Sequence, residues 1–380
     1  MRSTAPITVF AVDDRSVQVV WRGLRPGTLR LRAADASREV EVRVPAGAVL
    51  LEDLPPGRLL ELRADGSALA EPLTVAARTL DPLPGDELCR IATVSDLHLG
   101  TWVFGFRGTV VETPTPVRPH PVRCARAAMD EACEWGAQRL IVKGDITNHG
   151  QVDQWRTYAS LIRDAPVPVD ALPGNHDRAY RPRTPGLAPE EAAAAFGLSM
   201  AQPMLVRDHP GLRVILVDTT TPDHDRGSFR RCWDELLDAV ADADRAGGVL
   251  VAHHQQLHAH AVQEGWPIGI DHRESLELLE ALSRAHPHVL TTSGHTHRNR
   301  RWAHSGVTTT QVGATKDYPG AWAGYVVHEG GMRQIVRRVA RPDCLRWTEH
   351  SRRAAVGAWR WLGPGRLDAR CFNLLWSTRH

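Results

Sequence analysis

The chain has 380 residues, and its 46 Lys and Arg nearly balance its 44 Asp and Glu, giving a formal net charge of +2. This length predicts one to three domains, and the small charge argues against a surface built mainly for nucleic acid. The sequence contains no run of about 20 apolar residues, so we expect no membrane span and no membrane partner. Because no export signal is evident at the start, we expect a cytoplasmic protein whose six cysteines are reduced.

The first 86 residues predict a small all-β sandwich domain. Apolar and polar residues alternate in short segments separated by Gly, Pro and Asp turns. These segments are residues 7–12, 17–21, 29–32, 40–44, 49–51, 59–62 and 73–76. Trp21 and the tract from Leu51 to Leu62 resemble fibronectin type III domains, although Leu60 stands where those domains usually have Tyr. Residues 82–86 are rich in Pro and are the expected linker.

Residues 87–340 alternate between predicted strands and helices, as in an α/β domain. The expected helices are residues 125–135, 154–163, 190–195, 232–241 and 273–285. Strands expected at residues 306–312, 323–327 and 332–339 would complete a second sheet. Residues 341–380 form a tail that holds Trp347, Trp359, Trp361, Phe372 and Trp376, so we expect it to pack on the core.

Five apolar runs in the α/β region each end in side chains that can bind a metal ion. The motifs are Asp96-Leu97-His98, Gly144-Asp145, Gly174-Asn175-His176-Asp177, His253-His254 and Gly294-His295-Thr296-His297. Open α/β sheets bind ligands at the carboxyl ends of their strands, so we expect the five motifs at one sheet edge. Oxygen and imidazole ligands without cysteine suit Mn, Fe, Zn, Ni or Co.

In order and composition, these motifs resemble those of the calcineurin-like metallophosphoesterase superfamily, which are D-x-H, G-D-x-x-x-x-G, G-N-H-[DE], H and G-H-x-H. The resemblance implies a two-sheet α/β/β/α sandwich with a centre of two divalent or trivalent metal ions. One metal would be bound by Asp96, His98, Asp145 and His297. The other would be bound by Asp145, Asn175, His253 and His295, so that Asp145 bridges the two.

The resemblance also implies a reaction, in which a metal-bound hydroxide attacks a phosphate ester in line. His176 would give a proton to the leaving group, and Asp177 beside it could orient the ring and stabilise its charged form. The alternative for this pair is a structural histidine followed by a helix-capping aspartate. His149 and Arg298 are the candidate substrate contacts, and His254 is expected behind the ligands or in the core.

The sequences SDLHLG, GDITNHG, PGNHD and GHTHRNR resemble the bacterial branch of cyclic-nucleotide and glycerophosphodiester phosphodiesterases. We therefore expect a phosphodiesterase acting on a small phosphoester. A phosphomonoesterase of the same superfamily is the alternative, whereas the intact ligand set disfavours a non-catalytic binding scaffold. A purple acid phosphatase would have a metal-binding Tyr where this chain has Asn148. The sequence leaves open whether the chain forms a homo-oligomer.

Overall fold

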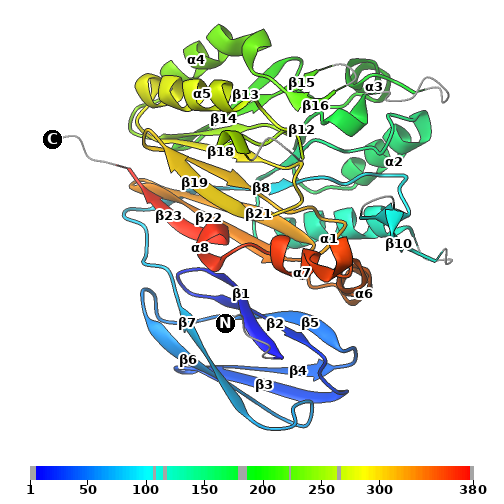
Figure 1. Cartoon of the computed structure of the whole chain (residues 1–380). Helices are drawn as coiled ribbons and strands as arrows, with labels where there is room; N and C mark the ends of the chain where they lie inside the picture. Colours follow the sequence, from blue (N-terminus) through cyan, green and yellow to red (C-terminus); the bar gives the residue numbers. More distant parts are fainter. Residues whose placement is uncertain are drawn as a thin grey trace.

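In the computed structural model, residues 6–105, 108–113, 118–178, 186–221, 224–262 and 267–376 are described. An all-β region at the N-terminus is followed by a larger part in which two sheets lie between layers of helices (Figure 1). The predicted fold class, a two-sheet α/β/β/α sandwich preceded by a small β-sandwich, is confirmed. Within the described ranges, no helix combines the length and the apolar composition that crossing a membrane requires.

The N-terminal region consists of two antiparallel sheets that share one core. The first sheet contains β1 (Ile7–Val12), β2 (Val17–Arg22) and β5 (Ala46–Leu51). The second, in the order β4-β3-β6-β7, contains β3 (Gly27–Ala33), β4 (Ala36–Val42), β6 (Leu59–Asp65) and β7 (Leu73–Arg78). Along β6, Leu60 and Leu62 are buried whereas Leu59 is exposed, as the period of two in a half-buried strand requires.

Each sheet of the larger part has six strands. The first has the order β12-β11-β8-β21-β22-β23 and contains β8 (Glu87–Val94), β11 (Arg139–Lys143), β12 (Val169–Leu172), β21 (Ala321–His328), β22 (Gly331–Arg338) and β23 (Cys371–Leu375). The second has the order β13-β14-β17-β18-β20-β19 and contains β13 (Met204–His209), β14 (Leu212–Val217), β17 (Gly248–Ala252), β18 (Val289–Ser293), β19 (Arg300–His304) and β20 (Val307–Gln311). Two short hairpins, β9 (Val103–Phe104) with β10 (Val110–Val111) and β15 (Thr220–Thr221) with β16 (His224–Gly227), lie outside these sheets.

Helices cover the outer faces of both sheets. The first sheet packs against α1 (His120–Glu134), α2 (Val152–Arg163), α3 (Pro189–Phe196) and the tail helix α6 (Pro342–Ser351). The second packs against α4 (Trp233–Ala241) and α5 (His272–Ala285), and the carboxylate of Asp271 caps α5 by accepting from the backbone N–H of Arg273 and Glu274. Apolar side chains of both sheets, including Ile91, Ile141 and Leu250, fill the layer between them.

The tail lies against the first sheet and ends in a strand. Its helices α7 (Trp359–Leu362) and α8 (Leu367–Arg370) follow α6, and β23 then pairs antiparallel with β22 at the sheet edge. Trp347 and Trp359 are buried. The indole N–H of Trp347 donates to the carbonyl of Lys316 and that of Trp359 to the carbonyl of Tyr318 at 2.9 Å. The tail thereby holds the loop that follows β20.

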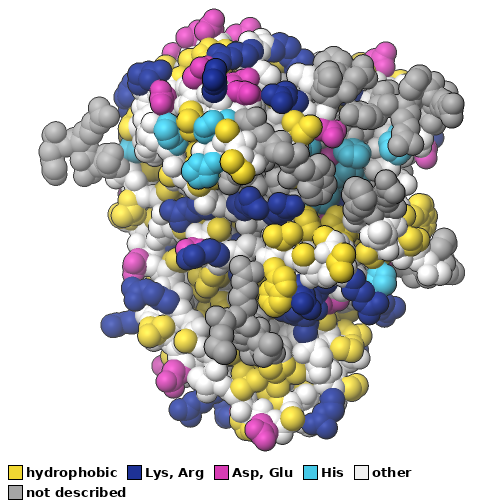
Figure 2. All heavy atoms as spheres, in the orientation of Figure 1, with side chains coloured by type: hydrophobic (Ala, Val, Ile, Leu, Met, Phe, Trp, Pro, Cys, Tyr) yellow, Lys and Arg dark blue, Asp and Glu magenta, His cyan; other side chains and the backbone are white. Residues whose placement is uncertain are grey.

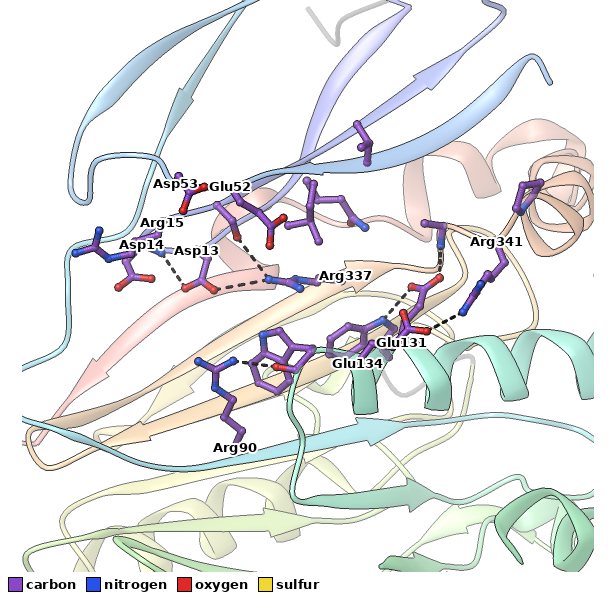
Figure 3. Close-up of a pocket in the computed structure, with 18 residues that line it drawn as sticks. Asp13, Asp14, Arg15, Glu52, Asp53, Arg90, Glu131, Glu134, Arg337 and Arg341 are labelled. Atoms are coloured by element: carbon purple, nitrogen blue, oxygen red, sulfur yellow. Dashed lines mark hydrogen bonds and ion pairs between the residues drawn. The ribbon is translucent and has the colours of Figure 1, made fainter. Parts of the chain in front are cut away.

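The N-terminal sandwich meets the first sheet through apolar contacts, in which Val326, Ile335 and Cys371 join its core, and through polar ones. The side-chain amide of Gln18 donates to the carbonyl of Arg338 and accepts from its N–H, both at 2.8 Å. The buried guanidinium of Arg333 pairs with Asp13 at 2.6 Å and Asp14 at 2.7 Å. Beside these contacts lies a cavity of about 650 Å³ that both parts line (Figure 3).

Glu131 of α1 faces this cavity, and its burial there opposes its ionisation. It accepts from the N–H of Ala340 at 2.8 Å and from the indole of Trp322 at 3.4 Å (Figure 3). Burial raises the pKa of Glu131 from 4.5 to about 7. The folded chain therefore holds this proton more tightly than the unfolded chain, and the resulting stability is present below pH 4.5 and lost as the pH rises through about 7.

Glu131→Gln removes this titration. We expect the variant to gain stability relative to the wild type between pH 5 and pH 8, by at most about 1.4 kcal/mol for each pH unit over which the wild-type proton is lost. Urea unfolding at pH 5, 6.5 and 8 measures the difference. The control is Glu134→Gln, because Glu134 is largely exposed and pairs with Arg341. An identical pH dependence for wild type and both variants would contradict the assignment.

Candidate metal centre

The loops that follow five strands meet at one edge of the two sheets. The parallel strands β8, β11 and β12 of the first sheet and β17 and β18 of the second each lead into one of the predicted motifs. Asp96, His98, Asp145, His295 and His297 all have a positive φ, between 45° and 65°. Such backbone costs about 1–3 kcal/mol per non-Gly residue and is found mainly at functional sites, so these loops are shaped for something other than stability.

The first cluster of side chains brings together Asp96, His98, His297 and one oxygen of Asp145. Nε2 of His98 lies 3.3 Å from Nε2 of His297 and 3.3 Å from Oδ2 of Asp145. Nε2 of His297 lies 3.4 Å from Oδ1 of Asp96. The hydroxyl of Ser95 holds the other Asp96 oxygen, and the N–H of His295 donates to Oδ1 at 3.0 Å.

The second cluster uses the other oxygen of Asp145. Oδ1 of Asp145 lies 3.2 Å from Nε2 of His254. The same His254 nitrogen lies 3.2 Å from Nδ1 of His295 and 3.2 Å from Oδ1 of Asn175. The two carboxylate oxygens of Asp145 thus face different clusters, which is the arrangement that a bridging ligand requires.

The structure places His254, and not the predicted His253, in this cluster. Along β17, Leu250 and Ala252 face the layer between the sheets, whereas Val249 and Val251 face the helices α4 and α5. The same alternation turns His254 toward the first sheet and His253 away from it. His253 instead hydrogen-bonds the carbonyl of Gln255 at 2.8 Å and packs edge-on against Phe229. The choice of His253 is therefore corrected to His254, and the alternation could have revealed this.

Each of three histidine rings bonds a supporting group through one nitrogen and turns the other nitrogen toward a cluster. His254 Nδ1 donates to the carbonyl of Lys143 at 2.8 Å, and His295 Nε2 donates to that of Ile268 at 2.7 Å. His297 Nδ1 donates to Asp317 at 2.6 Å. The opposite ring nitrogens lie close to one another and to carboxylate oxygens, so once deprotonated they can hold a cation between them. The residues therefore fit a dinuclear centre of nitrogen and oxygen ligands.

Two supporting carboxylates were not predicted from the sequence. Asp317 is buried, holds the His297 ring and lies 3.5 Å from the ammonium of Lys316. Asp225 accepts from the side-chain amide N–H of Asn175 at 3.0 Å, so the amide oxygen is the atom turned to the cluster. Neither residue belongs to a motif, and only the folded chain brings them to the site.

Burial and neighbouring charges give the histidines unequal proton affinities in the metal-free site. Burial, together with the charge of Lys316, holds the pKa of His98 well below its ordinary value, and burial lowers the pKa of His295 to about 3. Burial also acts to lower the pKa of His254, but the carboxylate of Asp145 raises it to about 9. A cation at the second cluster therefore has to displace a proton from His254.

His176 lies at the edge of the first cluster. Its Nδ1 hydrogen-bonds the carbonyl of Asn148 at 3.1 Å, and its ring meets that of His98 edge-on with centroids 4.6 Å apart. A ring nitrogen of His176 lies close to the ligand atoms of His98 and Asp145. His176 is thus placed to act on a group bound at the centre.

Asp177 has a different position from the one predicted. Its buried carboxylate accepts from the N–H groups of Ile146, Thr147 and Gly174 at 3.1, 2.7 and 2.8 Å. It also accepts from the hydroxyl of Thr147 at 2.9 Å. The three bonds from Ile146 and Thr147 tie the loop after β12 to the loop after β11, and the carbonyl of Asn148 orients the His176 ring instead. The prediction that Asp177 orients His176 is corrected accordingly.

The two predicted substrate contacts lie beside the clusters. The ring of His149 is 6.5 Å from that of His176. The half-buried guanidinium of Arg298 lies 5.4 Å from the ring centre of Trp359. Trp359 in turn contacts Phe104, whose ring stacks near His297. Both positions are compatible with contact to a bound molecule, and their roles stay predictions.

Comparison with known proteins places the chain in a family. The sequence profile of the calcineurin-like phosphoesterases matches residues 89–299. A purple acid phosphatase, PPD1 from yellow lupin (Lupinus luteus) seeds, is similar at 13% identity over 88% of this chain and 72% of that chain, with a TM-score of 0.47. The structure of PhoD is similar at 9% identity over 90% of this chain and 89% of that chain, with a TM-score of 0.45. The fn3 domain of human collagen alpha-1(XX) is 28% identical over 22% of this chain and 88% of that domain, with a TM-score of 0.17. No curated protein matches the chain.

The profile match covers more than half of the chain and includes every loop that contributes to the two clusters. Those loops supply carboxylates, imidazoles and an amide in the arrangement that two metal ions need. The chain belongs to the calcineurin-like phosphoesterase family and is a metal-dependent hydrolase of phosphoric ester bonds.

Proposed function

We propose that the protein is a phosphodiesterase with two metal ions bridged by Asp145. The observation that carries the proposal is the orientation of the Asp145 carboxylate, whose Oδ2 faces His98 and whose Oδ1 faces His254. One ion would be bound by Asp96, His98, Asp145 and His297. The other would be bound by Asp145, Asn175, His254 and His295. Mn, Fe, Zn, Ni and Co all accept such ligands.

Two features favour a diester over a monoester. The motif sequences resemble those of bacterial phosphodiesterases, and the carboxylate of Asp225 lies next to the second cluster through its bond to Asn175. A phosphomonoester is dianionic near neutral pH, whereas a diester bears a single negative charge. The charge of Asp225 therefore opposes a monoester more than a diester.

The reaction depends on how these residues hold the substrate and the proton. Metal ions at the two clusters would polarise the phosphoryl group and lower the pKa of water. Asn175 is neutral, so it completes a ligand set without cancelling positive charge. The Nδ1–H of His176 donates a hydrogen bond to the carbonyl of Asn148, so the second proton of the charged ring is at Nε2. From there the proton can pass to the leaving oxygen as the ester bond breaks.

The organisation of the whole chain completes the proposal. Residues 1–86 would be a fibronectin type III-like domain, which the two-sheet arrangement of β1 to β7 supports. Residues 87–340 would be the catalytic domain and residues 341–380 a tail that supports it. A cytoplasmic location, a small phosphoester as substrate and the absence of a nucleic-acid partner are parts of the same proposal.

The ligand assignment is tested by a matched pair, His254→Asn and His253→Asn. In each variant the amide can replace the Nδ1 donor, but it removes the nitrogen at Nε2. We expect His254→Asn to bind one metal ion per chain and to hydrolyse bis(p-nitrophenyl) phosphate at least about 100-fold more slowly. His253→Asn should keep two ions. Elemental analysis after reconstitution measures both, and the reverse pattern would restore His253 as the ligand.

The role of His176 is tested by its dependence on the leaving group. General acid catalysis is typically worth about 10²–10⁴-fold, and an alkoxide needs the proton far more than a nitrophenolate does. His176→Ala should therefore cost much of that range with an alkyl diester and clearly less with a nitrophenyl diester, with metal content unchanged. Equal losses on both substrates would show that His176 does not protonate the leaving group.

The preference for a diester is tested by Asp225→Asn, whose amide oxygen can still accept from Asn175. We expect wild-type kcat/KM to be higher for bis(p-nitrophenyl) phosphate than for p-nitrophenyl phosphate. Removing the negative charge should shift this ratio toward the monoester by up to about tenfold. A wild-type enzyme that prefers the monoester would make the protein a phosphomonoesterase.

A further inference from the structure

A basic groove with aromatic walls runs along the edge strand β19, next to the metal centre. It has a volume of about 380 Å³, which is within the range of small-molecule sites. Its polar and aromatic lining includes Arg300, Arg301, Arg366, Trp302, Trp361 and His260. No Asp or Glu is among the described residues that line it. Basic side chains cross the middle of the face that carries β19 and α8 (Figure 2).

Hydrogen bonds connect the walls of this groove to the metal centre. Gln311, in the lining, accepts at 2.9 Å from the hydroxyl of Thr296, the residue between the candidate ligands His295 and His297. Asn299 is buried and donates to the carbonyls of Gly363 and Pro364 in the tail, both at 3.3 Å. These bonds connect the groove to the loop that carries His295 and His297 and to the tail.

The positive charge in the groove is only partly compensated, because Arg366 pairs with the carboxylate of Asp368 at 2.8 Å. Arg300 is exposed, and in the described part of the chain no carboxylate pairs with it. Arg301 packs over Phe372 and donates to the carbonyl of Asp368 at 3.2 Å. An anion bound at Arg300 would compensate the charge of this guanidinium.

The aromatic side chains of the groove indicate a second property of the ligand. Trp361 is 42% exposed, which is unusual for a side chain of this size, and Trp302 is partly buried beside it. An exposed indole next to arginine stacks well on a planar heterocycle. The combination fits a planar ring joined to an anionic group.

The position of the groove tells which part of a diester it would hold. His176 comes from the loop after β12, which is an edge strand of the first sheet, whereas β19 is an edge strand of the second sheet. The group that leaves is the one near His176, so the groove lies on the side of the group that stays on the phosphate.

We propose that this groove binds the retained ester group of the substrate and selects a nucleoside that carries a second phosphate. The ring stacks on Trp361, and Arg300 binds the second phosphate. This inference rests on the proposed phosphodiesterase function. In the reaction, water adds its oxygen to phosphorus, the bond to the leaving oxygen breaks, and the product retained in the groove is a nucleoside bisphosphate.

The test uses two substrates with the same leaving group, thymidine 5′-(p-nitrophenyl phosphate) and its 3′-phosphorylated form. Because nitrophenolate leaves from both, kcat should be similar. The second phosphate should lower KM about tenfold in the wild type, and Arg300→Ala should abolish this advantage. Trp361→Ala should raise KM about tenfold for both nucleoside substrates without affecting methyl p-nitrophenyl phosphate. The control is Arg63→Ala, an exposed arginine of the N-terminal sandwich, which should change nothing.

The proposal is overturned if the 3′-phosphate leaves wild-type KM unchanged, or if its advantage persists in Arg300→Ala. Failure of the proposed function gives a different result, in which the metal-loaded enzyme hydrolyses none of these diesters. Binding of thymidine 3′,5′-bisphosphate, measured by calorimetry, then tests the groove without turnover. The wild type should bind it about tenfold more tightly than Arg300→Ala, and equal affinities would reject the site.

Discussion

The carboxylate of Asp145, held between two groups of imidazole nitrogens, is the interaction on which the site depends. The backbone N–H of His176 donates to Oδ1 of Asp145, and Asp145 itself has a left-handed φ of 47°. His254, His176 and His98 keep the pKa of Asp145 well below its ordinary value despite the opposing effect of burial. A buried carboxylate needs compensating positive charge, and metal ions bound at the two clusters would supply it.

The surrounding fold serves to keep these groups at close range. A Cβ atom on Gly174 would overlap the backbone nitrogen and Oδ1 of Asp145, and one on Gly294 would overlap the hydroxyl of Ser95. Glycine at these two positions therefore lets the loops approach one another. Tail residues Trp347 and Trp359 hydrogen-bond the loop that carries Asp317, and Asp317 orients the ring of His297. Residues distant in sequence thus set the direction of a ligand.

Sequence reasoning recovered the layered fold and the loops of the site because strand and motif patterns are local. His253 was preferred to His254 because motif matching ignored the side on which each residue leaves β17. Asp177 was assigned to His176 because the two are neighbours in sequence, whereas in the fold its carboxylate accepts from three donors in the loop after β11 and from Gly174 in its own loop. Asp225 and Asp317 could not be found at all, since their partners lie far away along the chain and no local pattern marks them.

The central claim is that two metal ions lie on either side of Asp145. An anomalous difference map from crystals of the manganese-loaded protein tests it directly. Two metal peaks about 3.5–4 Å apart are expected, one beside each carboxylate oxygen of Asp145. His254 should contact the same peak as Asn175. A single peak, or a second peak bound by His253 in place of His254, would contradict it.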